Sequence, residues 1–150
     1  MRRSERETSR ESALKTIDQC EWAVLSMRDG EGVYSLPISV VREDEFIYFH
    51  CAKQGKKIDC LRENPQVCLV CVGSAERAEE KYTMHYESAI INGTAAEITD
   101  PGEKVHVLRV LCERYAPNHM GGFEKSTAAS LEKTSIWQIK IDSITGKANR

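Results

Sequence analysis

Residues 47–61, IYFHCAKQGKKIDCL, join a strand-like run to a short helix through a loop that contains Gly55. The helix is predicted over residues 56–64, and Lys56 and Lys57 occupy its first turn. Cations at the positive end of a helix dipole cost about 0.3–1 kcal/mol each, whereas the free amides and ammonium groups there favour a phosphate. Such a local conflict is expected at functional sites. Two interpretations stay open: an anion-binding site, or two lysines that only solvate a surface turn.

The chain before this stretch predicts a tail, a helix and three strands. Residues 1–11 are almost all polar and predict a solvated tail, and apolar spacing within residues 13–20 predicts a short helix. Pro37 lies inside one predicted strand, and because proline cannot donate to a ladder, that strand should be unpaired on one side at an edge, a bulge or a ligand. The strands of this predicted three-strand meander are residues 22–27, 33–41 and 46–49.

The chain after this stretch predicts two strands, two helices and a final strand. Residues 67–72 and 82–99 are rich in β-formers, while residues 73–81 are charged and non-periodic. The pair Asn92-Gly93 fits either a two-residue hairpin or a bulge inside one bent strand.

A capping pattern marks the start of a helix after residue 100. Asp100, Pro101 and Glu103 supply an N-cap, a first-turn proline and a capping-box acid, and apolar residues follow at helical spacing to Tyr115. A short polar helix is predicted near residues 127–132. In the last strand the apolar residues alternate with polar ones and are Trp137, Ile139 and Ile141. About six strands without regular βαβ alternation predict a mainly β fold, a small antiparallel barrel.

Composition narrows the class of protein. The 150 residues, with 29% charged and 41% hydrophobic side chains, predict one globular domain, residues 12–150, behind the charged tail. A net charge of -2 argues against a nucleic-acid partner. No apolar run is long enough for a membrane span and no apolar segment follows the N-terminal charges, so a cytoplasmic protein is expected. Its six cysteines should then be reduced, and most are interpreted as small buried hydrophobes.

Metal, redox and hydrolase motifs are weak or missing. Cys68 and Cys71 form a Cys-x-x-Cys, but three residues apart on a strand they point to opposite faces, which disfavours zinc. The four histidines lack metal-ligand spacing; His106 is expected to be solvated, and only His50, at a strand end before the lysine loop, is a candidate functional side chain. No serine elbow, P-loop or dinucleotide fingerprint occurs.

The sequence resembles the FMN-binding split barrels related to pyridoxamine 5'-phosphate oxidase, and within them the nitroimidazole-reductase-like (Nim-like) branch. The resemblance spans residues 20–147 and is most specific in YFHCAKQGKKIDCLRENPQVC (48–68), with looser matches in YESAIINGTAAEI (86–98) and ITGK (144–147). It implies a six-stranded antiparallel split β-barrel that forms a homodimer with two flavin clefts between subunits. It also favours the bulge at Asn92-Gly93.

The resemblance implies a set of FMN-contacting residues. Lys56 and Lys57 match the pair that contacts the FMN phosphate, and His50 and Cys51 would lie beside the ribityl chain. The strand whose backbone lines the isoalloxazine ring corresponds to Leu36, Pro37, Ile38 and Ser39. Glu87 and Ser88 would approach the flavin from the second subunit.

Two departures from true pyridoxamine phosphate oxidases shape the expected function. The C-terminus lacks the Arg-x-His that holds the substrate phosphate, and Ser35 stands where those oxidases carry an arginine. A vitamin substrate is therefore not expected. The expected function is reduction of small electron-poor acceptors such as nitro-heteroaromatics, with His50 as the candidate proton donor; the alternative is a non-catalytic flavin- or haem-binding barrel that acts as a sensor or carrier.

Overall fold

The computed structural model describes residues 2–150, and its centre is an antiparallel sheet of eight strands in those residues. Neighbouring strands follow the order β3-β2-β6-β7-β8-β5-β4, and β1 pairs with β8 beside this path. The strands are β1 (Glu7–Thr8), β2 (Ala23–Asp29), β3 (Gly32–Ile38), β4 (Val41–Glu43), β5 (Phe46–Ala52), β6 (Gln66–Ala78), β7 (Thr83–Ile98) and β8 (Thr134–Asn149).

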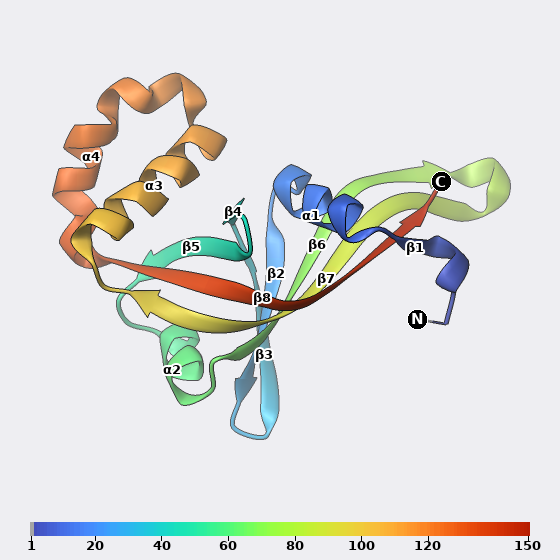
Figure 1. The fold of residues 1–150 in the computed structure, drawn as a ribbon, viewed down its shortest axis with the longest axis horizontal. Coiled ribbons are helices and arrows are strands. Elements are labelled where there is room, and N and C mark those ends of the chain that lie inside the picture. Colours follow the sequence, from blue (N-terminus) through green and yellow to red (C-terminus); the bar gives the residue numbers. More distant parts are fainter. Residues whose placement is uncertain (1) are drawn as a thin grey trace.

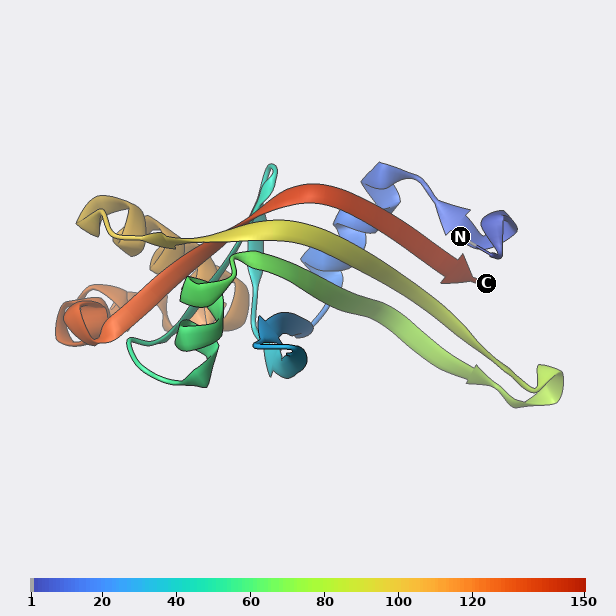
Figure 2. The same ribbon diagram turned by 90° about the horizontal axis from the view of Figure 1, so that it is seen from below.

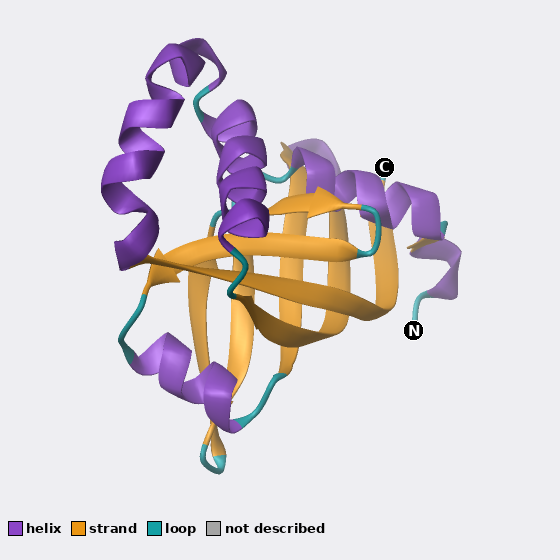
Figure 3. Cartoon of the chain, turned by 60° about the vertical axis from the view of Figure 1, so that its left-hand side comes forward, coloured by secondary structure: helices purple, strands orange, loops and turns teal. Residues whose placement is uncertain are grey.

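The sheet curls into a barrel that stays split, because its edge strands β3 and β4 are not paired with each other (Figure 3). Six of the strands have seven or more residues, while β1 and β4 are short additions. This architecture confirms the expected mainly β fold, an antiparallel split barrel. Its interior is filled by the alternating apolar residues of the strands; on β8 these are Trp137, Ile139 and Ile141, as the sequence predicts.

Four short α-helices and several 3-10 turns surround the barrel within residues 2–150 (Figures 1 and 3). Helix α2 adds Ile58 and Leu61 to the barrel core, whereas α3 covers a second, smaller core beside Ile136. Asp100 caps α3 as predicted, since its Oδ2 accepts the Glu103 backbone N–H at 2.9 Å. The α-helices are α1 (Arg10–Gln19), α2 (Lys56–Glu63), α3 (Pro101–Tyr115) and α4 (Phe123–Ser130); the 3-10 turns are η1 (Ser4–Arg6), η2 (Glu79–Lys81), η3 (Pro117–Gly122) and η4 (Leu131–Lys133).

The predicted three-strand meander is wrong after its first hairpin. Strands β2 and β3 pair, but the chain then crosses to the opposite edge of the sheet, where β5 pairs with β4 and β8 instead of β3. The break occurs at Val40, whose backbone N–H and C=O both bond to the Tyr115 hydroxyl of α3, at 3.1 and 2.7 Å. Because a side chain from α3 satisfies these backbone groups, the chain can turn away from β3 at no hydrogen-bonding cost.

The hairpin of β6 and β7 forms a long arm that reaches away from the barrel (Figures 1 and 2). The sequence predicts that this strand ends at residue 72, and that prediction is wrong, because β6 continues to Ala78. Its charged second half is held by pairing with β7, with a register shift between Val72 and Ala75. Asn92-Gly93 lies inside β7, which confirms one continuous strand in place of a hairpin; the register shift there leaves Asp142 of β8 as the extra residue of the bulge.

The predicted solvated tail contains a short strand, β1. Strand β1 pairs with Gly146 and Lys147 of β8, and α1 follows at Arg10. Most side chains before α1 are nevertheless exposed. No helix in residues 2–150 is both long and apolar enough to cross a bilayer.

Candidate functional site

The N-terminus of α2 presents free backbone amides to solvent. Gly55 precedes the helix with φ of 134°, a conformation that glycine adopts readily, and no side chain caps the first turn. The first N–H groups of a helix have no intrahelical acceptor, so the amides of Lys56 and Lys57 are available to an anion. The predicted placement of both lysines at this terminus is confirmed.

Lys56 is directed toward the β2–β3 hairpin. Its Nζ lies 2.6 Å from Asp29 Oδ2 and 4.9 Å from the centre of the Tyr34 ring. The hydrogen bond and charge of Asp29 raise the pKa of Lys56. Lys56 therefore remains a cation, but a carboxylate already neutralises part of its charge.

Lys57 is half-buried and lies over Phe49, with 5.7 Å between its Nζ and the ring centre. Within residues 2–150 no carboxylate oxygen lies within 4.0 Å of its Nζ. This lysine thus brings an uncompensated positive charge to the same end of α2.

His50 and Cys51 lie at the end of β5, within reach of this charge. His50 is exposed, but neighbouring groups desolvate part of its ring and lower its pKa, and the positive charge of Lys57 lowers it further. Burial raises the pKa of Cys51, while Lys57 opposes that rise. Since Cys51 packs against the barrel core with Phe49, His50 projects from the opposite face of β5.

The residues predicted to line a flavin ring run along the edge strand β3. Pro37 is exposed on this strand, which pairs only with β2, so the predicted unpaired side is an edge of the sheet. Leu36 lies two residues beyond Tyr34, the neighbour of Lys56, which on a strand is roughly 7 Å. Ser39 lies at the other end, beside Trp22 and Tyr115. The structure therefore brings the first part of residues 36–39 toward α2 and leaves the last part distant.

Glu87 and Ser88 are not brought to α2 within one chain. They lie on the arm side of β7, whereas α2 lies beneath the other half of the barrel (Figure 1). Glu87 forms an ion pair with Arg150, with 2.7 Å between its Oε1 and Nη2. Ser88 faces outward on a row with Val72 and Lys147.

An exposed apolar face lies on the outer side of β2, β6 and β7, next to Ser88. Trp22, Val72 and Ile90 are 56%, 47% and 46% exposed. Val24, Val70 and Ile90 form one continuous cross-strand row at its centre. Together these residues, Trp22, Val24, Val70, Val72 and Ile90, are called the outer apolar face below.

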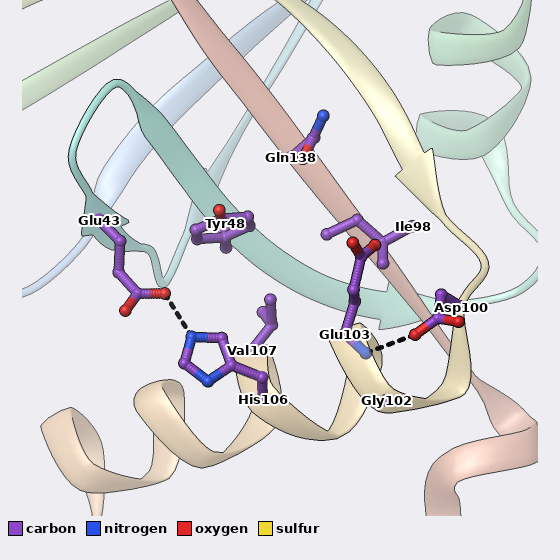
Figure 4. Close-up of a pocket in the computed structure, with 9 residues that line it drawn as sticks. All are labelled: Glu43, Tyr48, Ile98, Asp100, Gly102, Glu103, His106, Val107 and Gln138. Carbon is purple, nitrogen blue, oxygen red and sulfur yellow. Dashed lines mark hydrogen bonds and ion pairs between the residues drawn. The ribbon is translucent and has the colours of Figure 1, made fainter.

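Sequence reasoning missed a polar pocket of about 450 Å³ between α3 and the strands β4, β5 and β8 (Figure 4). His106 is exposed, as expected, and its Nε2 also lies 2.7 Å from Glu43 Oε1. Burial, and after it the charge of nearby carboxylates, raises the pKa of Tyr48, which also lines the pocket. These residues come from elements far apart in the chain, so no local pattern could have grouped them.

The cysteines and histidines form no metal centre in the described residues. No group of three His, Cys, Asp or Glu side chains within residues 2–150 is arranged to hold a metal. Cys68 is half-buried and Cys71 is fully buried, as expected for two residues that lie three positions apart on β6 and face opposite sides of it.

Comparisons with known proteins identify similar folds. A family profile described as pyridoxamine 5'-phosphate oxidase matches residues 9–148. A candidate 5-nitroimidazole antibiotic resistance protein from Bacteroides thetaiotaomicron has a TM-score of 0.81 at 23% identity, covering 93% of this chain and 83% of its own. The FAD and heme binding protein from Mycobacterium smegmatis scores 0.83 at 20% identity, covering 97% and 74%.

A third similar structure is the flavocytochrome Anf3 from Azotobacter vinelandii, with a TM-score of 0.77 at 19% identity, covering 95% of this chain and 68% of its own. The sequence has no significant match among curated proteins. At these identities the structural likenesses establish a shared fold.

Proposed function

The chain belongs to the pyridoxamine 5'-phosphate oxidase family, and from this premise we propose that it is an oxidoreductase that binds flavin mononucleotide (FMN). The observation that carries the proposal is the uncapped N-terminus of α2 with the unpaired charge of Lys57. A phosphate monoester fits this place because it can accept from the free amides and pair with the lysine.

The phosphate grip consists of Lys57, Lys56 and the backbone amides of α2. Lys57 contributes most, since Asp29 already engages Lys56. Ser35 stands on β3 where the oxidases of the family carry an arginine, so the grip relies on α2. FAD lacks a terminal monoester, and for this reason FMN is the preferred ligand.

The remaining flavin contacts come from β5 and β3. His50 and Cys51 lie at the end of β5 beside α2, where the ribityl chain would extend from the phosphate. The edge of β3 along Leu36, Pro37 and Ile38, which Ser39 follows, presents backbone groups that no strand pairs on that side. These groups would hydrogen-bond the polar rim of the flavin ring.

A second copy of the chain completes the site. Burying the outer apolar face in a two-fold dimer would remove its exposed side chains from water and bring Ser88, which lies on that face, toward the other subunit. Such an isologous interface yields two equivalent flavin sites. The proposed homodimer would use the face that carries Ser88, whereas the neighbouring Glu87 side chain points to the other side of β7, toward Gly73 and Thr16.

The flavin, when bound, would supply transfer of hydride or single electrons to a small electron-poor acceptor such as a nitro-heteroaromatic. The chain binds and orients the flavin and shields one side of it from water. His50 holds one imidazole proton at neutral pH, because its pKa is lowered and the ring is uncharged there. We assign this N–H as the donor to the acceptor as negative charge develops.

Pyridoxamine phosphate is not the proposed substrate. The C-terminal strand lacks the Arg-x-His that would hold a second phosphate, and loss of two or three charge-assisted contacts at roughly 1.5–3 kcal/mol each weakens such a substrate by several powers of ten.

The alternative is a flavin- or haem-binding barrel without turnover, with His50 as the iron ligand. Two similar structures support this alternative: the flavocytochrome, and the FAD and heme binding protein.

The absorption spectrum of the purified protein, before and after addition of a nicotinamide donor without oxygen, distinguishes these functions. We expect a flavin band that the donor bleaches and a nitro-heteroaromatic restores. A Soret band would support the haem alternative, and a flavin that no donor reduces would support a carrier. Efficient formation of pyridoxal phosphate would refute the proposed substrate class.

A further inference from the structure

A pocket of about 500 Å³ opens where the end of α1, the segment after β3 and the end of α3 meet. Trp22, Ser39, Arg114 and Tyr115 are among the residues that line it. Small-molecule sites usually have volumes of roughly 300–1,000 Å³, so the pocket can hold a compound with one or two aromatic rings.

Two exposed aromatic side chains form walls of this pocket. Trp22 is 56% exposed and Tyr115 is 40% exposed. The Tyr115 ring is fixed, because its hydroxyl bonds both backbone groups of Val40. Trp22 also lines a groove over Val24 and Val72, so it stands between the outer apolar face and the pocket. No other residue of the pocket belongs to that face, and the proposed dimer therefore leaves the pocket open.

Arg114 supplies a positive charge at the wall of the pocket. Its Nη2 donates to the carbonyl oxygens of Ile17, at 3.1 Å, and of Cys20, and these bonds fix the guanidinium beside the Tyr115 ring. Within residues 2–150 its Nη1 and Nε donate to no other group, and no ion pair joins it to a carboxylate. The guanidinium therefore has N–H groups left for a ligand.

The carboxylates of the pocket leave this charge available. Asp18 is engaged by Arg42, with 2.9 Å from its Oδ1 to Nε and 2.6 Å from its Oδ2 to Nη2. Glu21, the other carboxylate of the lining, is exposed, so solvent screens its charge. An electron-rich group on a ligand can thus reach Arg114 without displacing a carboxylate.

The pocket lies at the far end of the strand that we propose lines the flavin. Tyr34 lies next to Lys56, and Ser39 lies in the pocket; five residues of extended chain separate them, which is roughly 16 Å. A flavin whose phosphate is held at α2 and whose ring follows β3 would extend toward the pocket. This step rests on the proposed function, whereas the pocket and its charge do not.

We propose that this pocket binds the electron acceptor, a nitro-heteroaromatic compound, next to the flavin. The planar ring stacks on the Trp22 indole, and the two nitro oxygens accept from the free N–H groups of Arg114. A guanidinium suits a nitro group because its parallel N–H groups match two coplanar oxygens that carry partial negative charge. Trp22 and Arg114 thus bind and orient the acceptor.

The test is NMR of the unaltered chain without flavin, labelled with nitrogen-15, whose two tryptophans give two indole N–H signals. Trp22→Phe assigns the Trp22 signal, and the buried Trp137 is the internal reference. The probe is N-methyl-nitropyrazole, and N-methylpyrazole, which is also uncharged but lacks the nitro group, is the control ligand. We expect the nitro compound to shift the Trp22 signal alone, with a dissociation constant of roughly 0.1–1 mM. The control ligand should bind about tenfold more weakly.

Arg114→Lys separates stacking from recognition of the nitro group. Lysine keeps the positive charge but lacks the parallel N–H groups, so the nitro compound should bind about tenfold more weakly while still shifting the Trp22 signal. Arg109→Lys is the matched control on α3, because Arg109 pairs with Glu124 and does not line the pocket, and its affinity should be unchanged. If Arg114→Lys does not fold, the two ligands on the unaltered chain decide the matter.

The same chain loaded with oxidised FMN tests the place beside the flavin. We expect nuclear Overhauser effects between protons of the nitro compound and of the flavin ring. The proposal is overturned if the nitro compound leaves the Trp22 signal unchanged, or if it binds at Trp22 without contact to a bound flavin. A chain that takes up no FMN but shows the Trp22 shift would refute the proposed function and still support the ligand class of the pocket.

Discussion

Lys56 Nζ lies 2.6 Å from Asp29 Oδ2, so a charge pair joins the first turn of α2 to the end of β2. The neighbouring Lys57 has no such partner in residues 2–150 and instead lies over the Phe49 ring. Two adjacent lysines that look equivalent in the sequence therefore differ in the charge they can offer to a ligand. Lys57 is the stronger candidate for holding a phosphate.

Lys57→Met should weaken FMN binding by about 10- to 100-fold, because it removes a charge-assisted contact of roughly 1.5–3 kcal/mol. Lys56→Met should have a smaller effect, since Asp29 shares its charge. Fluorescence titration measures both, and riboflavin, which lacks the phosphate, is the control ligand. Equal losses for FMN and riboflavin would show that the lysines do not contact the phosphate.

Asp29→Asn should strengthen FMN binding a few-fold. The substitution keeps the shape of the side chain but removes the charge that engages Lys56, so the ammonium group becomes free to turn toward the phosphate. The same titration measures the gain, and it should disappear in the Asp29→Asn, Lys56→Met double variant. A gain that persists there would mean that Asp29 acts on the ligand directly.

His50 should titrate below its usual pH range, and Lys57→Met should raise its pKa because one of the two causes of the shift is removed. FMN should also raise it by adding negative charge, whereas riboflavin should not. NMR of the imidazole Cε1–H measures each value. If the His50 pKa is the same with and without FMN, the phosphate does not bind near His50.

The same shift has a consequence for stability. The folded chain binds the His50 proton less readily than the unfolded chain, whose histidine has a pKa near 6.5. The contribution of His50 to the free energy of unfolding is therefore fully present above about pH 6.5. It is lost as the pH falls through the pKa of His50 in the folded chain, which lies below 6.5. His50→Gln should flatten that part of the denaturation profile.

Local patterns predicted those parts of the fold that depend on neighbours in sequence. The strand, loop and helix around Gly55, the cap at Asp100 and the alternation on β8 each follow from residues within one element. The break after β3 does not, because it depends on Tyr115, 75 residues after Val40. Likewise the extension of β6 depends on pairing with β7 rather than on its own composition.

The candidate site divides in the same way. The lysine pair could be found from its place in the helix, but the engagement of Lys56 by Asp29 joins two elements whose proximity no local pattern encodes. Asn92-Gly93 is a further example. The pair favours a hairpin turn in isolation, yet β6 and β8 both offer partners to the residues that follow it, and the strand continues.

Gly93→Ala should destabilise the protein by about 1–3 kcal/mol. An added Cβ would lie 2.5 Å from Ile139 Cγ2 and 2.5 Å from the backbone oxygen of Lys140, which cannot move without disturbing β8. Gly121→Ala is the matched control, because an added Cβ there meets no atom within 4 Å. Denaturant unfolding measures both, and equal stabilities would mean that the bulge is looser than the structure indicates.

Mixed dimers should recover flavin binding that two inactive parents lack. Ser88→Trp should block the site by projecting from the outer face into the flavin of the other subunit, and Lys57→Met should impair the phosphate grip of its own subunit. If each site combines Lys57 of one chain with Ser88 of the other, a mixed dimer contains one doubly altered site and one intact site. We therefore expect mixed dimers, purified with two different tags, to bind about half as much FMN per dimer as the unaltered protein, and either variant alone to bind little at the same FMN concentration.

Light scattering must show that both variants remain dimeric. No recovery in the mixed dimer would place Lys57 and Ser88 in the same site of one chain, and a monomer that still holds FMN would refute the shared site.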